Sequence, residues 1–306
     1  MYIIGENIHI LSPRVREALA NRDKKFFQDL AERQLEAGAS ALDLNIGPQK
    51  KAGPEVMTWL VNTIQEVVDL PLSFDTTNLE AIEAGLKIAK QPAIINSTSA
   101  QPERLEKVPP LAKQYGARLI ALTMGDSGIP VSAEARVSIA LEYLLPRADE
   151  VGLPYDQLII DPLVLTVSGC QEYVPECVEA VRTLRQMMDP PLNISVGLSN
   201  VSNQVPPENR RLINRVYMVM LMAAGLNMAI ADPLDEKLKE FIYIVERRND
   251  STPLGRLLLK LYDATAAGGS LEREDVEWDD PEQVAVYKTV QILRNKVIYA
   301  DSYLTV

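Results

Sequence analysis

The stretch "LSFDTTN", residues 72–78, passes from apolar to polar within a few residues. Leu72 and Phe74 are typical of a buried strand, and Asp75 begins a run of carboxylate, hydroxyl and amide groups where that strand should end. Because such residues also cap helices, this stretch alone is compatible with either a helix cap or one wall of a binding site. The way in which the other strands end decides between the two readings.

Seven further apolar runs, separated by amphipathic segments of helical length, predict seven more strands. With residues 72–77, the predicted strands cover 2–6, 41–47, 93–98, 118–124, 157–163, 194–200 and 228–233. Eight such units predict an α/β fold in which a parallel sheet closes into a (β/α)8 TIM barrel. A doubly wound open sheet is the alternative, but no G-x-G-x-x-G motif follows any of these strands.

The chain of 306 residues is expected to form one barrel domain, since single α/β barrels reach this length. A long helix with a proline kink and a glycine stop is expected over 132–152. Residues 247–283 break the alternation, with a Gly pair, a short amphipathic piece and an acidic run over 272–282. We expect this segment to be an insertion in the last helical layer, after which 285–304 resume a helix and a tail.

Composition limits the function. A net charge of −11 argues against a nucleic-acid-binding protein, which would need a basic surface. No apolar run approaches the roughly 18 residues of a membrane span, and the N-terminus does not resemble a signal peptide, so a cytoplasmic location is expected. Cys170 and Cys177 are expected to be reduced thiols. His9 is the only histidine, which excludes zinc sites built from several histidines.

Seven of the eight predicted strands end in a carboxylate or an amide. These residues are Glu6 and Asn7, Asp43 and Asn45, Asp75, Asn96, Asp161, Ser199 and Asn200, and Asp232. In a TIM barrel the carboxyl ends of the strands meet at one rim, where ligands bind. The sequence therefore predicts a polar site at that rim.

Helix capping explains only part of this pattern. Asn78, Ser97, Thr98 and Ser202 are expected to be helix N-caps. In contrast, Asp43, Asp75 and Asp161 occur one or two residues too early to cap the next helix. A carboxylate buried at such a position costs several kcal/mol unless it has a partner, so we assign these three to a site.

The residue types at the rim indicate the kind of ligand. There is little positive charge near the strand ends, and no lysine lies within the predicted strands, which disfavours phosphate ligands and Schiff-base chemistry. Carboxylates and amides suit a neutral heterocycle with adjacent N–H donors and a carbonyl, such as a pterin. A Mg²⁺ site built from Asp and Glu is the competing explanation.

Seven motifs in chain order resemble those of the pterin-binding barrel family: "IIGENI", "ALDLNIGP", "DTTN", "INSTSA", "IDPL", "GLSNVSN" and "AIADP". Within this family the chain is most similar to the methyltetrahydrofolate:corrinoid/iron–sulfur protein methyltransferases of anaerobic carbon metabolism (the acetyl-CoA pathway). Relatives occur in corrinoid O-demethylase systems and in cobalamin-dependent methionine synthase. The resemblance covers residues 1 to about 245 and resumes near 290.

The resemblance implies a set of site residues. Asp75, Asn96 and Asp161 match the family's pterin-ring ligands, and Asn200 matches its mobile asparagine, which hydrogen-bonds N5 of methyltetrahydrofolate. Arg210 matches an arginine near the folate and is expected to meet the ligand's anionic tail. The implied reaction moves the N5 methyl group to the Co(I) of a corrinoid on a partner protein, or the reverse. The resemblance also implies a homodimer and no metal in this chain.

Other functions remain open at this point. Dihydropteroate synthase shares the barrel and ring ligands, but it typically ends the last strand in an Arg-x-His pair, whereas this chain has "ADPLDE", residues 231–236. A non-catalytic barrel that only holds a corrinoid protein, or a metal-dependent lyase, are further alternatives. The chain also has "GENIH" where relatives have "GERIN", so Asn7 and His9 alter the rim at the first strand.

Overall fold

A computed structural model describes residues 1–304 and shows a strand at each of the eight predicted apolar runs. The run over 194–200 is the exception in extent, because only its Ile194 lies in a strand and its end belongs to the 3-10 helix Leu198–Ser202. The strands are β1 (Tyr2–His9), β2 (Ala41–Asn45), β3 (Leu72–Asp75), β4 (Ile94–Ser99), β5 (Arg118–Leu122), β6 (Leu158–Asp161), β7 (Asn193–Ile194) and β8 (Met228–Ala231). They form one sheet in the order β7-β6-β5-β4-β3-β2-β1-β8, and every pair is parallel. The predicted (β/α)8 barrel is therefore confirmed.

The barrel closes between β7 and β8 through an irregular segment. After β7, the Ser195 N–H donates to Ile160 O at 2.9 Å, and the Ile230 N–H donates to Val196 O at 2.9 Å. An isolated parallel bridge joins Gly197 to Ile230. We call residues 195–197, with the adjoining Ile230, the seam of the barrel.

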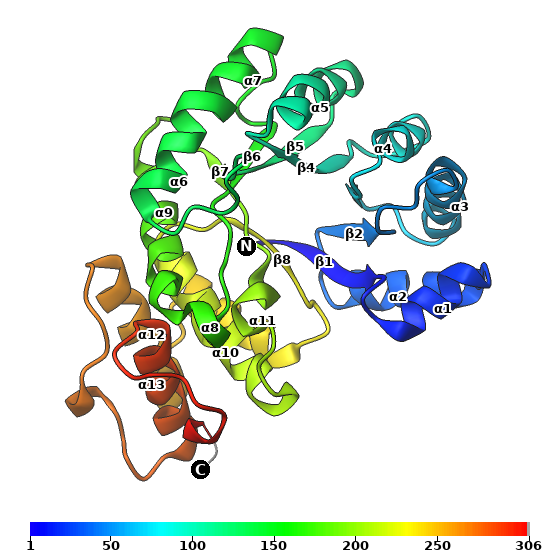
Figure 1. Cartoon of the computed structure of the whole chain (residues 1–306). Coiled ribbons are helices and arrows are strands. Elements are labelled where there is room, and N and C mark those ends of the chain that lie inside the picture. The colour runs from blue at the N-terminus through cyan, green and yellow to red at the C-terminus, as the bar shows by residue number, and fades with distance from the viewer. Residues whose placement is uncertain (305–306) are drawn as a thin grey trace.

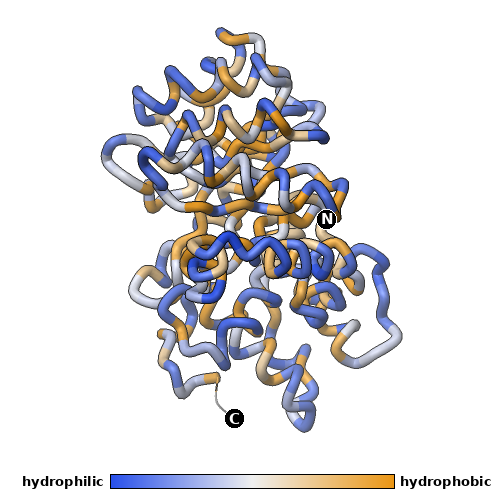
Figure 2. The backbone as a smooth tube through the Cα atoms, turned by 90° about the vertical axis from the view of Figure 1, so that its right-hand side faces the viewer, coloured by the Kyte–Doolittle hydropathy of each residue, from blue (hydrophilic) through white to orange (hydrophobic). Residues whose placement is uncertain are grey.

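Helices surround the strands, as Figure 1 shows. They are α1 (Pro13–Ala20), α2 (Lys24–Glu36), α3 (Gly53–Gln65), α4 (Leu79–Leu86), α5 (Pro102–Tyr115), α6 (Ala133–Ile139), α7 (Leu145–Val151), α8 (Val167–Cys170), α9 (Val174–Gln186), α10 (Pro207–Ala223), α11 (Glu236–Arg247), α12 (Pro253–Ala266) and α13 (Pro281–Leu293). Viewed from another side, hydrophobic stretches run through the interior and hydrophilic ones follow the outer turns (Figure 2).

Strand residues alternate between two cores, because successive side chains point to opposite faces of a sheet. The barrel interior holds a small cluster made of Ile4, Ala41, Ile94, Ile120, Ile159 and Met228. The other set, which includes Leu42, Phe74 and Ile160, packs against the helices in the large outer core. The side chains two positions beyond the inner cluster therefore point into the barrel near its carboxyl end.

The predicted helix over 132–152 is interrupted. It consists of α6, a π-helical turn over Ala140–Leu144, and α7, which ends at Gly152 in the left-handed conformation (φ 67°). Pro146 lies in the first turn of α7, directly after the π-helical turn. A proline cannot donate the backbone hydrogen bond of a regular helix, which accounts for the irregularity at this place.

The predicted insertion contains a regular helix. Most of what the sequence indicated as a short amphipathic piece is α12, a helix of 14 residues that buries Leu254, Leu257, Leu258, Leu259 and Leu261. This helix packs on α10 and α11, and α13 packs on α10 beside it (Figure 1). Helices α12 and α13 thus thicken the helical layer over α10.

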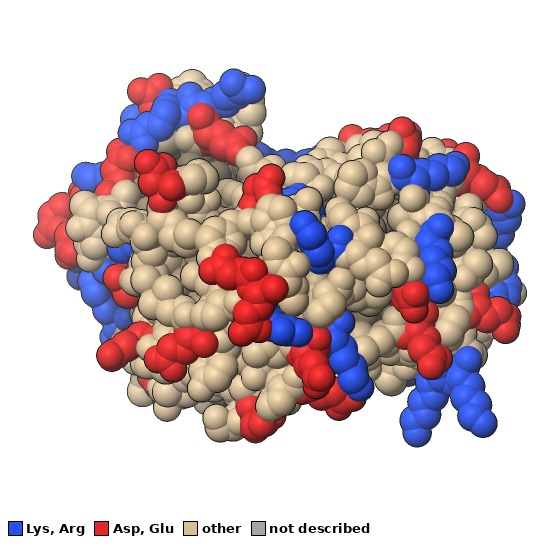
Figure 3. Space-filling view, turned by 90° about the horizontal axis from the view of Figure 1, so that it is seen from above, with Lys and Arg blue, Asp and Glu red and all other residues tan. Residues whose placement is uncertain are grey.

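The surface shown in Figure 3 carries interspersed acidic and basic side chains and gathers no broad basic area on that face. Within residues 1–304, none of the helices has the length and apolar character needed to cross a bilayer. Both cysteines, Cys170 and Cys177, are free thiols, as expected.

Candidate pterin site at the barrel rim

The polar strand ends predicted from sequence converge on the mouth of the barrel. Their positions follow from the alternation of the strands: Glu6 lies two residues after Ile4, Asn96 after Ile94, and Asp161 after Ile159. On β3, the residue opposite Asn96 in the strand register is Asp75. These side chains therefore share the inner face with the small apolar cluster beneath them.

Asp43, on β2, supports the part of the site that Asn96 of β4 forms. It is buried, and its Oδ1 accepts hydrogen bonds from the Ser73 hydroxyl at 2.6 Å and from Asn96 Nδ2 at 3.1 Å. Burial, together with the nearby Asp75 charge, raises the pKa of the Asp43 carboxyl well above its usual value. The Asn96 amide nitrogen donates to Asp43. The Asn96 carbonyl oxygen accepts no hydrogen bond within residues 1–304 and remains available to a ligand.

Asp75 is held in a similar way by a hydrogen bond from Asn45 of the neighbouring strand β2. Asn45 donates from Nδ2 to one Asp75 oxygen, while the Asn45 carbonyl accepts the Gly47 N–H at 3.1 Å. Burial raises the Asp75 pKa, and the hydrogen bond from Asn45 lowers it. The second Asp75 oxygen accepts no hydrogen bond in the described part of the chain.

Asp161 ends β6 and is buried. The Leu163 N–H donates to its Oδ1 at 2.7 Å, and Leu163 has a φ of 67°, a left-handed conformation that is uncommon for a leucine. Burial raises the pKa of Asp161 to about 7, although the Leu163 N–H and the charge of Arg136 both lower it. A carboxyl group with such a pKa changes its charge near neutral pH, as groups at functional sites often do.

A second cluster of polar side chains lies at the other side of the barrel mouth. The Ser199 hydroxyl donates to Glu6 Oε2 at 3.0 Å, and Asn7 Nδ2 donates to Asp232 Oδ1 at 2.9 Å. Burial and the Asp232 charge raise the pKa of Glu6 to about 7, while the bond from Ser199 lowers it. The register of β1 shifts between Gly5 and Ile8, and such a bulge can bring successive side chains, here Glu6 and Asn7, to the same rim.

Asn200 and Arg210 lie beyond the strand ends. Asn200 belongs to a short 3-10 helix, η3 (Leu198–Ser202), is exposed, and accepts one long hydrogen bond, from Asn203 Nδ2 at 3.4 Å. Arg210, in the first turn of α10, is exposed and donates from Nε to Val205 O at 2.6 Å. Within residues 1–304, no hydrogen bond joins Arg210 to the other predicted site residues.

Two arginines near the rim were not predicted. Arg104 donates from Nη1 to Thr77 O at 3.1 Å and from Nη2 to Ser97 O, so it ties the loop after β3 to the end of β4. Arg136 is buried, and its charge lowers the pKa of Asp161. A signal for Arg136 exists in the sequence, because it lies three residues after Ala133 and four before Ala140, on the buried face of its helix.

The capping predictions are partly wrong. Asn78 caps α4, since its side chain accepts the Ala81 N–H at 3.1 Å. Ser97 and Thr98 instead lie inside β4, which extends further than predicted, and the Thr98 hydroxyl donates to Arg104 O. Ser202 ends η3 and donates to Ser199 O, whereas α10 begins after Pro206.

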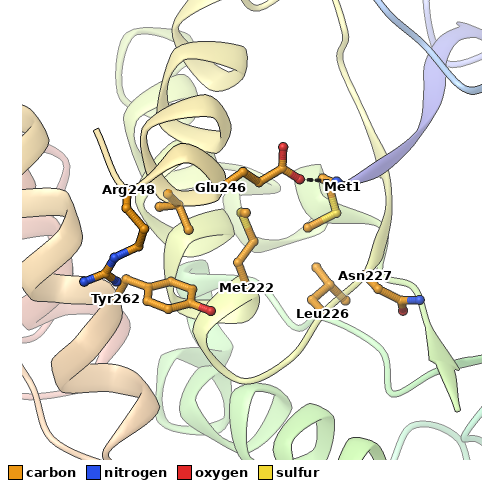
Figure 4. A pocket seen from close by; sticks show the side chains of 8 residues that line it. Met1, Met222, Leu226, Asn227, Glu246, Arg248 and Tyr262 are labelled. Carbon is orange, nitrogen blue, oxygen red and sulfur yellow. Dashed lines mark hydrogen bonds and ion pairs between the residues drawn. The ribbon is translucent and has the colours of Figure 1, made fainter. Parts of the chain in front are cut away.

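A cavity of about 380 Å³ lies at the opposite end of the barrel (Figure 4). It is lined by Met1, Met222, Leu226, Asn227, Val245, Glu246, Arg248 and Tyr262. Met1 precedes β1 and Asn227 precedes β8, so this cavity belongs to the amino ends of the strands and is separate from the polar rim. In residues 1–304, no three His, Cys, Asp or Glu side chains are grouped so that they could hold a metal ion.

The model of one protein family, described as pterin binding enzyme, matches residues 13–232. The match covers most of the barrel, from α1 to the end of β8. The chain therefore belongs to the pterin-binding enzyme family.

Two relatives are similar in sequence to most of this chain. The chain is 28% identical over 248 residues to the methylcorrinoid:tetrahydrofolate methyltransferase of Eubacterium limosum, covering 80% of this chain and 90% of that one. It is 26% identical over 295 residues to the methionine synthase of Mycobacterium leprae, covering 90% of this chain. The match spans only 24% of that much longer synthase.

Solved structures of dihydropteroate synthases share the fold. The enzyme from Yersinia pestis superposes with a TM-score of 0.57 at 19% identity, covering 81% of this chain and 92% of that one. The enzyme from Coxiella burnetii, solved with pteroic acid, gives a TM-score of 0.58 at 17% identity, covering 81% of this chain and 94% of that one. At these identities the likeness establishes the barrel alone.

Proposed function

We propose that the protein transfers a methyl group between N5 of tetrahydrofolate and the cobalt of a corrinoid held by a separate protein. The observation that carries this proposal is the set of inward-facing groups on Asp75, Asn96 and Asp161 in the mouth of a pterin-family barrel. The Eubacterium limosum relative, whose name states this reaction, supports it.

The unpaired atoms of the rim match a pterin ring. Asp161 and Asp75 each keep one carboxylate oxygen that accepts no hydrogen bond within residues 1–304, and Asn96 keeps its carbonyl oxygen. A pterin presents an amino group beside a ring N–H, which are donors to such acceptors. We propose Arg210 for the anionic tail of the folate, since α10 begins at the same end of the barrel.

The chemistry is a displacement at the methyl carbon. In one direction the N5–carbon bond breaks as the cobalt–carbon bond forms, and N5 keeps the electron pair of the broken bond. An uncharged amine is a poor leaving group, so N5 must gain a proton or an equivalent hydrogen bond during transfer. The reverse direction, with tetrahydrofolate as acceptor, passes through the same transition state.

Asn200 is proposed as the catalytic hydrogen-bonding residue at N5. An amide can supply only hydrogen bonding that strengthens as charge develops, so the proton itself is expected to come from water. The exposed position and the single long hydrogen bond of Asn200 leave its side chain free to turn towards a ligand. The acceptor is proposed to be a corrinoid/iron–sulfur protein or an O-demethylase corrinoid protein, and the protein itself a homodimer.

The test is calorimetric titration with methyltetrahydrofolate in the absence of added metal. The wild type is expected to bind at micromolar concentration, and Asp161→Ala is expected to lose binding. Methyl transfer to free cob(I)alamin then tests the reaction without an identified partner protein. If the wild type binds no folate, the methyltransferase proposal fails, and titration with Mg²⁺ tests the metal-site alternative.

A further inference from the structure

The short 3-10 helix η3 (Leu198–Ser202) has three different sides, because one turn of such a helix takes three residues and residues three apart share a side. Leu198 and Val201 share the side that is buried in the outer core. Asn200 lies on the exposed side, and its side chain accepts the long bond from Asn203. Ser199 lies on the third side, which is turned to the barrel mouth.

Ser199 joins this third side to the first strand of the barrel. Its hydroxyl donates to Glu6 Oε2 at 3.0 Å, although the two residues are 193 positions apart in the sequence. Glu6 lies two residues after Ile4 of the inner cluster and is partly buried at the mouth. Within residues 1–304, the Glu6 carboxyl group accepts no other hydrogen bond. The contact therefore joins β1 to η3 at the residue directly before Asn200.

The other contacts of this loop lie farther from Asn200 along the chain. Gly197, at the seam, pairs with β8 through one isolated bridge. The Thr166 hydroxyl donates to Asn203 O at 2.6 Å, just beyond the end of η3. In the part of the chain that the structure describes, the bond between Ser199 and Glu6 is the one side-chain hydrogen bond that joins η3 to a barrel strand.

The side chain of Asn200 rests against Gly197. A Cβ atom at Gly197 would lie 2.8 Å from Asn200 Nδ2, so the glycine makes room for the amide. In the proposed reaction, this amide turns from Gly197 to N5 of the folate. A misplacement of about 1 Å at such a group can lower a rate about 10²-fold, so the backbone that carries it must be held.

We propose that Glu6 is a positioning residue for the methyl transfer, which holds η3 through the Ser199 hydroxyl so that Asn200 meets N5 of the folate. The inference rests on the proposed function, in which Asn200 supplies the hydrogen bond to N5. Glu6 acts through Ser199 and Asn200 and does not itself contact the reacting atoms. Its removal is therefore expected to lower the rate of transfer and to leave the folate Kd nearly unchanged.

Single-turnover methyl transfer to cob(I)alamin tests the bond at pH 8.5, where Glu6, with a pKa of about 7, is ionised. Glu6→Ala and Ser199→Ala are each expected to lower the rate constant about tenfold, and the double variant is expected to be no slower, since both changes remove the same bond. Glu6→Gln keeps an acceptor oxygen and is expected to retain at least about a third of the wild-type rate. Losses that multiply in the double variant, or equal losses in Glu6→Gln and Glu6→Ala, would overturn the proposal.

A second double-mutant cycle, with Asn200→Ala, distinguishes positioning from direct contact with the substrate. If Glu6 acts through Asn200, Glu6→Ala lowers the rate no further in a chain that already carries Asn200→Ala. A further loss of about tenfold in that chain would show that Glu6 acts on the substrate by itself, and would overturn the proposal.

Thr166→Val is the matched control, because it removes the hydrogen bond to Asn203 O beyond the end of η3. Its rate is expected to stay near that of the wild type. A loss equal to that of Glu6→Ala would show that any loosening of the loop has the same effect, and would overturn the particular role of Glu6. If Glu6→Ala does not fold, Ser199→Ala takes its place in the second cycle and in this comparison.

The same measurements separate this inference from the proposed function. A wild type that neither binds methyltetrahydrofolate nor transfers its methyl group would overturn both. A wild type that transfers the methyl group, with the full rate kept in Glu6→Ala and Ser199→Ala, would overturn the positioning role of Glu6 alone.

Discussion

Asp43 and Asn96 are joined across the barrel mouth by a hydrogen bond of 3.1 Å, although β3 lies between their strands. This bond fixes the orientation of the Asn96 amide, with its nitrogen turned to Asp43 and its oxygen left for another partner. Asp43 is thus the support of a proposed ligand contact that Asn96 makes.

Replacing Asp43 should therefore weaken folate binding indirectly. Asp43→Ala leaves the Ser73 hydroxyl and the Asn96 amide unpaired, and is expected to cost about 1–3 kcal/mol of stability and to weaken methyltetrahydrofolate binding about tenfold. Urea unfolding and calorimetric titration measure the two effects. The matched control is Ser73→Ala, which keeps the anchor of Asn96 and should bind folate nearly as the wild type does. Equal affinities for Asp43→Ala and the wild type would contradict this role.

Asn200 should matter for the rate more than for affinity. Asn200→Ala is expected to lower kcat for methyl transfer by about 10²-fold, because a hydrogen bond that strengthens with developing charge is lost, and to change the folate Kd only slightly. The residue is exposed, so stability should stay within about 0.5 kcal/mol of the wild type. Single-turnover kinetics with cob(I)alamin measure the chemical step, and Gln204→Ala, at an exposed position of the same loop, is the control. A loss confined to Kd would argue for a binding role alone.

The buried carboxyl groups predict a distinctive pH dependence of stability. Glu6 and Asp161, with pKa values raised to about 7, bind a proton more tightly in the folded chain than in the unfolded one. Their contribution is therefore full at acidic pH and is lost as the pH rises from about 4 to about 7, by at most about 1.4 kcal/mol per pH unit for each group. Glu6→Gln and Asp161→Asn should each reduce this decline in urea unfolding at pH 5, 6, 7 and 8. Slopes equal to that of the wild type would show that these groups titrate normally.

Arg104 should stabilise the neighbouring site residues through the loops that carry them. Arg104→Met removes the link between Thr77 O and Ser97 O, and is expected to weaken folate binding several-fold and to cost about 1–2 kcal/mol. Arg147→Met is a matched control, since Arg147 donates to Leu105 O and Glu106 O, away from these strand ends. If both variants lose stability but neither loses affinity, Arg104 has a structural role only.

The strands and the rim were readable from sequence because both follow from local pattern. An apolar run that ends in a carboxylate, as at Asp75 or Asp161, specifies a strand and the position of its polar end. The sequence did not reveal that Asp43 supports Asn96, because their strands are separated by β3 and the bond depends on barrel closure. Arg136 was missed for a related reason, since the complete burial of its side chain depends on how α6 packs in the fold.

The segment 247–283 shows a different limit of prediction from sequence. Its glycine pair and acidic run indicated a loop, whereas the leucines of α12 determine its structure by packing on α10 and α11. The wrong capping predictions at Ser97 and Thr98 have a different cause, because here a strand extends further than the local sequence indicates. Strand pairing with β5 continues to Ser99, and these residues are held in the sheet before a helix can begin.

The seam of the barrel has a consequence for its dynamics. β7 pairs with β6 through only two residues, and the chain after it reaches β8 through one isolated bridge. Local opening requires the least free energy where the fewest backbone hydrogen bonds must break, so amide protons there should exchange with solvent faster than those of the other strands. Asn200 lies three residues after this seam in the chain. The barrel wall is thus most easily deformed beside the residue that the proposed reaction requires to move.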